Sequence, residues 1–308
     1  MEIEKMLDSG ELPKDLDIYK SFLTTRKKFE ESKNILCSVS GGADSDLMVD
    51  MFCRFDKDKV RFVFFDTGLE YNATKEHLNY LEEKYKIEIE RVRPEKPIPL
   101  ACREFGQPFL SKQVSEFIQR LQKHGFQWEN DSYSNLIQKY PKCSSALKWW
   151  CDEKGAGSMF SIRNNKHLKE FMTENPQTFR ISNKCCQHSK KLPLTRYKKG
   201  KGFDLDCSGV RKYEGGVRGV AYKSCFTDNS NKDNEINTYR PLFWYKNETK
   251  EAYEKFFGIT HSKCYSEYKL KRTGCAGCPF AKGFEEELKV LETFEPKLFK
   301  AVNNIFKD

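Results

Sequence analysis

The chain has 308 residues, of which 38% are hydrophobic and 14% aromatic, enough to bury one large core or two modest ones. No apolar run approaches the roughly 20 residues that span a bilayer, and the charged N-terminus lacks the apolar stretch of a signal peptide, so we expect a cytoplasmic protein without a membrane partner. Lys and Arg outnumber Asp and Glu by 54 to 45, a formal net charge of +9 that favours anionic ligands.

Three segments near the N-terminus have the patterns of strands. Residues 35–39 and 60–65 are apolar runs, and residues 87–92 alternate between apolar and charged side chains. Apolar side chains at helical spacing separate these segments, over residues 44–55 and 73–85. Alternating strands and helices predict an α/β fold with a parallel, doubly wound sheet, which binds ligands at the carboxyl ends of its strands.

The rest of the chain gives weaker signals. Residues 1–31 have the pattern of an amphipathic helical segment, and residues 127–178 are interpreted as a packed helical insertion. A strand is expected at 239–244 and helices at 248–257 and within 284–306. We place the domain boundary after residue 180. Residues 1–180 then hold the N-terminal helix, the nucleotide-binding core and the insertion, and residues 181–308 hold a cysteine-rich part that completes the same sheet.

The first candidate site is the small-residue loop at residues 40–45, Ser-Gly-Gly-Ala-Asp-Ser, between the first strand and its helix. Such a loop aims backbone N–H groups and a helix N-terminus at an anion, and its glycines allow phosphate oxygens to come close. It lacks the Gly-Lys-Ser/Thr ending of the Walker loop and does not fit the dinucleotide glycine pattern. The alternative is a glycine turn that only joins the two elements.

This loop resembles the pyrophosphate loop (PP-loop) of the ATP pyrophosphatases. The resemblance implies an adenine nucleotide alpha-hydrolase-like, Rossmann-like fold. It also implies an enzyme that cleaves ATP between the α and β phosphates, with Mg²⁺ held partly by Asp44. The residues that would bind the phosphates are Ser38, Ser40, Gly41, Gly42, Asp44 and Ser45, with Asp44 and Ser45 as catalytic candidates.

Two further segments match this wider family, which includes the phosphoadenylylsulfate (PAPS) reductase-like proteins. Asp66, Thr67 and Gly68 follow the second strand and resemble an Asp-Thr-Gly that shapes the adenosine pocket. The bland alternative is a helix-capping turn after a strand, and both interpretations can be true. Residues 209–218 read Gly-Val-Arg-x-x-Glu-x-x-x-Arg. The resemblance implies that Arg211 and Arg218 clamp phosphate or substrate, with Glu214 orienting one of them; a surface salt-bridge cluster is the alternative.

The second candidate site is made of cysteines. Cys185 and Cys186 are adjacent, and Cys275 and Cys278 form a C-x-x-C about 90 residues later. Twelve cysteines grouped in a large chain fit metal binding or thiol chemistry better than disulfides. Four thiolates can hold an iron–sulfur cluster, while structural zinc and unligated thiols remain the alternatives.

The surroundings of these cysteines add a resemblance. Residues 184–194 (Lys-Cys-Cys-Gln-His-Ser-Lys-Lys-Leu-Pro-Leu) and 272–280 (Arg-Thr-Gly-Cys-Ala-Gly-Cys-Pro-Phe) resemble the cluster segments of the iron–sulfur adenylylsulfate reductases. The resemblance implies a [4Fe–4S] cluster on Cys185, Cys186, Cys275 and Cys278, in a C-terminal cluster-binding region.

Departures from the reductases point to a different reaction. The chain shows no Glu-Cys-Gly-Leu/Ile-His motif, which carries the reductase nucleophile, and its phosphate loop is intact. We therefore expect an ATP-dependent sulfurtransferase that adenylates an acceptor and inserts sulfur, related to DNA phosphorothioation and tRNA thiolation enzymes. Cys264, beside Lys263, is the preferred spare thiol for catalysis. A sulfonucleotide reductase and a non-catalytic nucleotide- or nucleic-acid-binding module are the alternatives.

The partners are less constrained. The sulfur donor is sulfide or a persulfide from a cysteine desulfurase. The acceptor is tRNA, DNA or a small molecule, and a homodimer is left open. A basic stretch over residues 190–201 adjoins the cysteine pair and is our candidate docking surface for a polyanion, although such stretches are often only solvated surface.

Overall fold

The computed structural model describes residues 3–155, 157–158, 161–215, 221–229, 235–281 and 283–306. It divides into two compact units, each made of two chain segments. Unit 1 is Met1–Arg93 with Pro193–Ala276, and unit 2 is Pro94–Leu192 with Gly277–Asp308. This division differs from the boundary predicted after residue 180, because the second unit is inserted between strands of the first.

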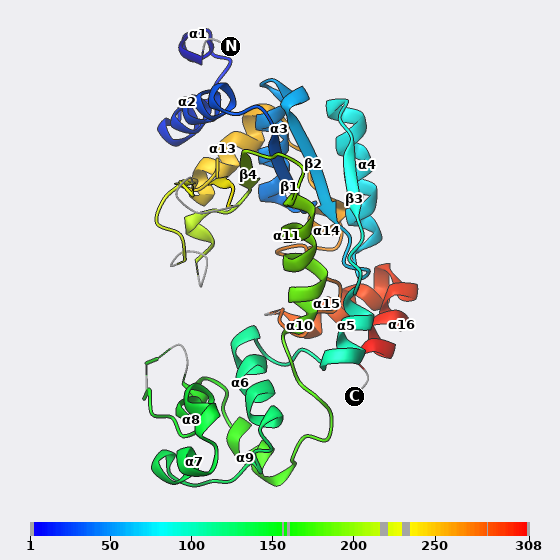
Figure 1. Ribbon diagram of the computed structural model, residues 1–308. Helices are drawn as coiled ribbons and strands as arrows, with labels where there is room; N and C mark the ends of the chain where they lie inside the picture. The colour runs from blue at the N-terminus through cyan, green and yellow to red at the C-terminus, as the bar shows by residue number, and fades with distance from the viewer. Residues whose placement is uncertain are drawn as a thin grey trace. The chain divides into compact units, whose positions relative to one another are not determined.

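Unit 1 is built on a six-stranded sheet with the order β3-β2-β1-β4-β6-β5 (Figure 1). Every pairing is parallel except that of β5 with β6. The strands are β1 (Ile35–Val39), β2 (Val60–Phe65), β3 (Ile89–Val92), β4 (Leu205–Ser208), β5 (Phe226–Thr227) and β6 (Asn237–Tyr239). The predicted parallel α/β sheet is confirmed, and the later part of the chain does complete it.

The helices of unit 1 include those predicted within residues 1–31 and at 44–55, 73–85 and 248–257, together with two at 192–198 and 263–266 that were not predicted. They are α1 (Ile3–Asp8), α2 (Leu16–Glu31), α3 (Ala43–Cys53), α4 (Asn72–Tyr85), α13 (Asn247–Phe257) and α14 (Lys263–Ser266), with α11 (Leu192–Lys198) starting at the unit boundary. Short 3-10 turns cover Lys57–Lys59 and Lys212–Glu214. Among the described residues, no helix is both long and apolar enough to cross a bilayer.

Alternation along the central strand places helices on both faces of the sheet. Ile35, Cys37 and Val39 of β1 belong to one buried cluster, which includes side chains of α2, α3 and α13. Leu36 belongs to another, which contains Tyr197 of α11. Successive side chains of a strand point to opposite faces, so a strand buried on both sides is apolar throughout, which is why residues 35–39 and 60–65 carry a strong signal.

A buried carboxylate fixes α13 against α3. Asp50 of α3 is 2% exposed and accepts hydrogen bonds from Tyr253 of α13 (2.6 Å) and Tyr85 of α4 (2.9 Å). Arg54 lies 2.8 Å from the same carboxylate and balances its charge. Burial of a carboxylate is tolerated when it is paired and hydrogen-bonded, and this one links three helices around the phosphate loop.

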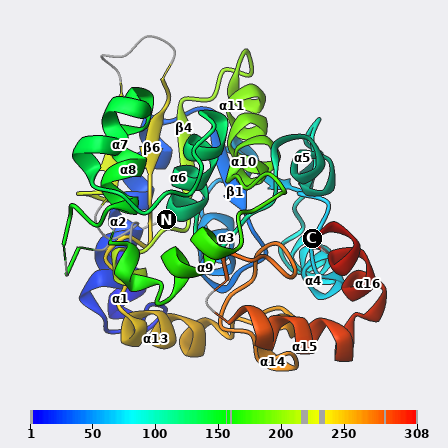
Figure 2. The ribbon, with the colours of Figure 1, turned by 90° about the horizontal axis from the view of Figure 1, so that it is seen from below.

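Unit 2 is helical. Its helices are α5 (Ile98–Phe105), α6 (Lys112–Lys123), α7 (Tyr133–Lys139), α8 (Ser144–Trp150), α9 (Leu168–Glu174), α10 (Lys184–Cys186), α15 (Phe284–Phe294) and α16 (Pro296–Ile305). A π-helical turn covers Gln187–Lys191, and 3-10 turns cover Pro141–Cys143 and Ile162–Asn164. Trp149 and Trp150 fill the core of the predicted insertion, and α15 packs on α16 (Figure 2).

Candidate nucleotide and thiol sites

The loop between β1 and α3 is a tight turn that leads into the N-terminus of α3. Gly41 has φ +65°, and a Cβ there would lie 2.7 Å from Thr74 Cγ2. A Cβ on Gly42 would lie 2.9 Å from Thr273 Oγ1. Both glycines are thus required by space, and at Gly41 the left-handed conformation adds a second reason. The sequence explains the loop because no other residue type fits these positions without displacing a neighbour.

Replacing Gly41 with Ala tests this geometry. We expect Gly41→Ala to lower the free energy of unfolding by about 1–2 kcal/mol from the left-handed backbone alone, and by more from the contact with Thr74. The matched control is Gly10→Ala, where φ is +75° but nothing lies within 4 Å of the added Cβ. Urea unfolding measures both. Equal losses in the two variants would show that the loop is not tightly packed against α4.

Serine side chains hold the loop closed. The hydroxyl of Ser45 donates to the carbonyl of Gly42 (2.9 Å), and the N–H of Ser40 donates to Ser45 Oγ (3.3 Å). The N–H of Gly42 donates to Ser40 Oγ (3.3 Å). Ser38 differs, because its hydroxyl is buried and has no hydrogen-bond partner among the described residues. A buried polar atom without a partner beside an anion-shaped turn fits a site built for a ligand.

Asp44, in the first turn of α3, is held by two cations. Arg211 Nε lies 3.0 Å and Lys250 Nζ 3.1 Å from Asp44 Oδ1. Arg211 is 7% exposed and also donates to the Tyr245 carbonyl (3.3 Å) and to Asn247 Oδ1 (3.2 Å). The structure therefore brings Arg211 to the loop, as its predicted role requires, and adds Lys250, which the sequence did not reveal.

Two other residues of the segment 209–218, Glu214 and Gly209, lie against Arg211 and the phosphate loop. Glu214 accepts from the backbone N–H of Arg211 (3.2 Å), so it positions that residue through the main chain. Gly209 packs on the loop, since a Cβ there would lie 2.9 Å from the carbonyl oxygen of Asp44. Arg218, the second predicted clamp, lies outside the described residues.

A partly buried network of charged side chains connects Asp44, through Lys250, to Asp46. Asp46, which is 1% exposed, has its Oδ2 atom 2.7 Å from His261 Nδ1 and 3.0 Å from His77 Nε2. On its other side His261 Nε2 lies 2.9 Å from Glu254, which lies 3.5 Å from Lys250. Burial opposes a charge on His261, but its bonds to Asp46 and Glu254 prevail and raise its pKa to about 9.

Asp66, Thr67 and Gly68 form a compact turn at the carboxyl end of β2. The N–H of Gly68 donates to Asp66 (3.0 Å), and Thr67 Oγ1 donates to Glu70 (2.7 Å). Cys275 joins this turn, with its thiol 3.6 Å from Thr67 Oγ1. The turn stands beside the phosphate loop in the sheet, because β1 and β2 are paired in parallel and both loops leave from carboxyl ends.

Thiols gather in unit 2. Cys185 hydrogen-bonds to Cys102 and to Cys186, and its electrostatic environment includes Cys278. The hydrogen bond with Cys102 is the main reason that the pKa of Cys185 is raised, to about 12. Helix α5, which carries Cys102, packs against α10, which carries Cys185 and Cys186. Cys102 could not be recognised from the sequence, because it is a solitary cysteine without another cysteine at ligand spacing.

These thiols fit an iron–sulfur or zinc site by their chemistry. Among the residues that the structure describes, no three His, Cys, Asp or Glu side chains are arranged around a metal position. Cys185, Cys186 and Cys278 belong to unit 2, and Cys275 belongs to unit 1, three residues from Cys278. The predicted ligand set therefore stays a prediction.

Cys264, the thiol predicted to be catalytic, is completely buried. It lies in α14, with its sulfur 3.6 Å from Thr74 Oγ1. Thr74 is the residue against which Gly41 packs. The structure thus places Cys264 near the phosphate loop but inside the protein, where it has no access to a second substrate without movement of α14.

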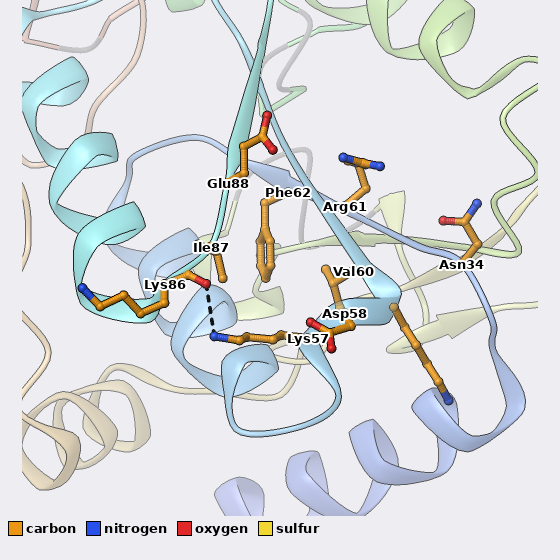
Figure 3. A pocket seen from close by; sticks show the side chains of 10 residues that line it. Asn34, Lys57, Asp58, Val60, Arg61, Phe62, Lys86, Ile87 and Glu88 are labelled. Atoms are coloured by element: carbon orange, nitrogen blue, oxygen red, sulfur yellow. Dashed lines mark hydrogen bonds between the residues drawn. The ribbon is translucent and has the colours of Figure 1, made fainter.

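A separate cavity of about 270 Å³ lies at the other end of the sheet (Figure 3). It is lined by residues before and at the start of β2 and before β3, including Lys57, Arg61 and Glu88. Lys57 Nζ donates to the carbonyls of Tyr85 (2.7 Å) and Lys86 (3.1 Å) at the end of α4. Because its lysine caps a helix and the cavity lies away from the strands' carboxyl ends, we assign it no part in the nucleotide site.

Comparison with known proteins finds a family match over the segment that contains the loop. Residues 34–140 match the family model for the phosphoadenosine phosphosulfate reductase domain. The predicted resemblance to PAPS reductase-like proteins is thereby confirmed for this segment. A solved structure, the PAPS reductase from Candida auris in its phosphate complex, shares 13% identity, with a TM-score of 0.46. The alignment covers 89% of this chain and 93% of that one. No curated protein sequence matched the chain.

Proposed function

We propose, starting from the phosphoadenosine phosphosulfate reductase domain at residues 34–140, that the protein is an ATP-dependent sulfurtransferase. It would cleave ATP between the α and β phosphates, adenylate an acceptor and exchange the AMP for sulfur. The observation that carries the proposal is Asp44, held by Arg211 and Lys250 at the start of α3. A carboxylate, two cations and a helix N-terminus are what binding and activating a triphosphate needs.

Each group has a defined part in this chemistry. The N-terminus of α3 and Arg211 would bind the phosphate chain and withdraw charge from it as the leaving pyrophosphate forms. Asp44 would supply a carboxylate ligand for Mg²⁺, which neutralises phosphate charge when bound. The turn at Asp66–Gly68 would contact the adenosine, since it stands beside the loop at the same edge of the sheet.

Sulfur delivery rests on the thiols. We propose that Cys185, Cys186, Cys275 and Cys278 hold a [4Fe–4S] cluster, with zinc as the alternative. With one thiolate on each of its four irons, such a cluster would supply redox chemistry at the site when bound. Cys264 remains a proposed persulfide carrier, and its burial predicts that it reacts slowly with thiol reagents in the resting protein.

A second function is favoured by the family match. The matched domain is named for PAPS reductases, so reduction of an activated sulfate to sulfite is the alternative. The two reactions separate cleanly in one assay. A sulfurtransferase exchanges labelled pyrophosphate into ATP once an acceptor is present, and a reductase releases sulfite from adenylylsulfate or PAPS with a thiol reductant.

The acceptor is proposed to be a polyanion that meets the basic stretch at residues 190–201, with a small molecule as the alternative. In unit 1, Lys198 lies 2.8 Å from Asp206, and Lys201 lies over the Tyr197 ring and 3.8 Å from Glu90. Part of this charge is therefore balanced within the protein. Lys190 and Lys191 belong to unit 2, in the π-helical turn.

Salt dependence tests the acceptor proposal. We expect tRNA or DNA binding to weaken steeply with salt, because counterions are released from the nucleic acid. Replacing Lys190, Lys191, Lys198 and Lys199 together with Gln should flatten that dependence and leave ATP binding unchanged. The control replaces four other exposed lysines: Lys14, Lys20, Lys75 and Lys255. If neither nucleic acid binds at low ionic strength, the acceptor is a small molecule.

A further inference from the structure

A continuous series of charged side chains runs from the interior of unit 1 to the phosphate loop. It starts at Asp46 and continues through His261 and Glu254 to Lys250, which ends on Asp44. The separations are 2.7, 2.9, 3.5 and 3.1 Å in that order. The members come from α3, α13 and the segment before α14.

Burial and neighbouring side chains hold the members of this series in place. The side chains of Asp46, Glu254 and Lys250 are 0%, 22% and 19% exposed. His77 of α4 lies on the same oxygen of Asp46, and the ring of Tyr265 lies 5.8 Å from that of His261. Helix α13 cannot easily shift, because Tyr253 is bonded to the buried Asp50. Lys250, at the outer end of the series, is the member whose side chain contacts Asp44.

The balance of charges around Asp44 indicates how Lys250 could become free to bind a phosphate. With His261 protonated, three cations (Arg211, Lys250 and His261) face three carboxylates (Asp44, Asp46 and Glu254). A divalent cation on Asp44 would leave an excess of positive charge at the helix N-terminus. A phosphate chain is the ligand that neutralises this excess, and Lys, as a flexible point charge with three donors, can turn from the carboxylate to the phosphate.

We propose that Lys250 is a polyphosphate-binding residue that exchanges its ion pair with Asp44 for the outer phosphates of a nucleotide, and that His261 and Glu254 position it. The proposal rests on the proposed function for the identity of the ligand and narrows it to nucleotides with at least two phosphates. Lys250 reaches the loop from α13, whereas the adenosine would lie at the turn after β2. It therefore selects phosphate chain length and contributes nothing to adenosine binding.

Nucleotide binding by calorimetry, with Mg²⁺ present, tests Lys250. Lys250→Gln should weaken ATP and inorganic pyrophosphate binding by about 10- to 100-fold, the usual effect of losing a charged hydrogen bond. AMP binding should not change, and Lys250→Arg should restore most of the affinity. The matched control is Lys255→Gln, an exposed lysine on the same helix. Unchanged ATP affinity in Lys250→Gln, or an equal loss for ATP and AMP, would overturn the proposal.

A pH profile tests the positioning residues. His261 keeps its proton through neutral pH and loses it as the pH rises through about 9. Glu254 then attracts Lys250 more strongly, so ATP affinity should fall over that range. The fall should persist in Lys250→Arg, where no lysine titrates, and disappear in His261→Gln. A fall that survives in His261→Gln would show that His261 has only a structural role.

The binding assays distinguish a failure of the proposed role of Lys250 from a failure of the proposed reaction. If the wild-type protein binds ATP but forms no AMP, the proposed reaction is wrong while the role of Lys250 is still decided by affinity. If the wild-type protein binds neither ATP nor pyrophosphate, both are wrong.

Discussion

Asp44→Asn is expected to lower the release of AMP and pyrophosphate from ATP by about 100-fold or more, while the protein stays folded. Asn keeps the size of the side chain but removes the negative charge that faces Arg211 and Lys250. Losing one preorganised electrostatic contact in a transition state typically costs this much. Asp44→Ala should have the same effect, and Ser45→Ala should add a loosened loop, because Ser45 bonds to both Ser40 and Gly42.

The control for this loss is Asp58→Asn, which removes a carboxylate at the opposite end of the sheet. It should retain full activity. Product formation is measured with ATP labelled on the α phosphate, and folding by thermal melting. An Asp44→Asn protein that releases AMP and pyrophosphate at the wild-type rate would remove the loop from the mechanism.

Loss of iron from variants of the proposed cluster cysteines is the second large effect that we expect. Protein purified without oxygen should be brown, absorb near ~400 nm and hold about four irons per chain. Cys275→Ser and Cys278→Ser should each lose most of that iron, because a hydroxyl is a poor replacement for a thiolate ligand at a cluster. Cys185→Ser should do the same, although Cys102 lies beside it.

The matched control is Cys151→Ser, which changes a half-buried cysteine at the end of α8. Its thiol donates a hydrogen bond to the carbonyl of Asp131 (3.6 Å). Its iron content should equal that of the wild type. Stoichiometric zinc without iron, in protein kept free of oxygen, would contradict the cluster and transfer the sulfur chemistry to free thiols such as Cys264.

The sheet and its loop could be predicted because their signals are local. An apolar run that ends in Ser-Gly-Gly-x-Asp-Ser specifies a strand, a tight turn and a helix within twenty residues, and β1 and α3 lie within two residues of the expected bounds. The bounds of α4 and α13 were equally close, because amphipathic spacing and polar ends mark them.

The interior of the site could not be predicted, because its partners are distant in the sequence. Asp46 and His261 are 215 residues apart, and nothing in a lone histidine distinguishes a buried partner from a surface residue. Lys250 is one of many lysines, and its place beside Asp44 depends on α13 being fixed against α3 through Asp50 and Tyr253. The second compact unit pairs Pro94–Leu192 with Gly277–Asp308, two segments that are far apart in the sequence, and a single boundary after residue 180 does not express that pairing.

The proposed function depends above all on cleavage of ATP between its α and β phosphates. The most direct measurement incubates the protein, loaded without oxygen and given candidate acceptors, with ATP labelled on the α phosphate and follows the labelled product. We expect labelled AMP with an equal amount of pyrophosphate, and loss of both products in Asp44→Asn. Labelled ADP, or unchanged ATP together with sulfite release from adenylylsulfate or PAPS, would contradict it.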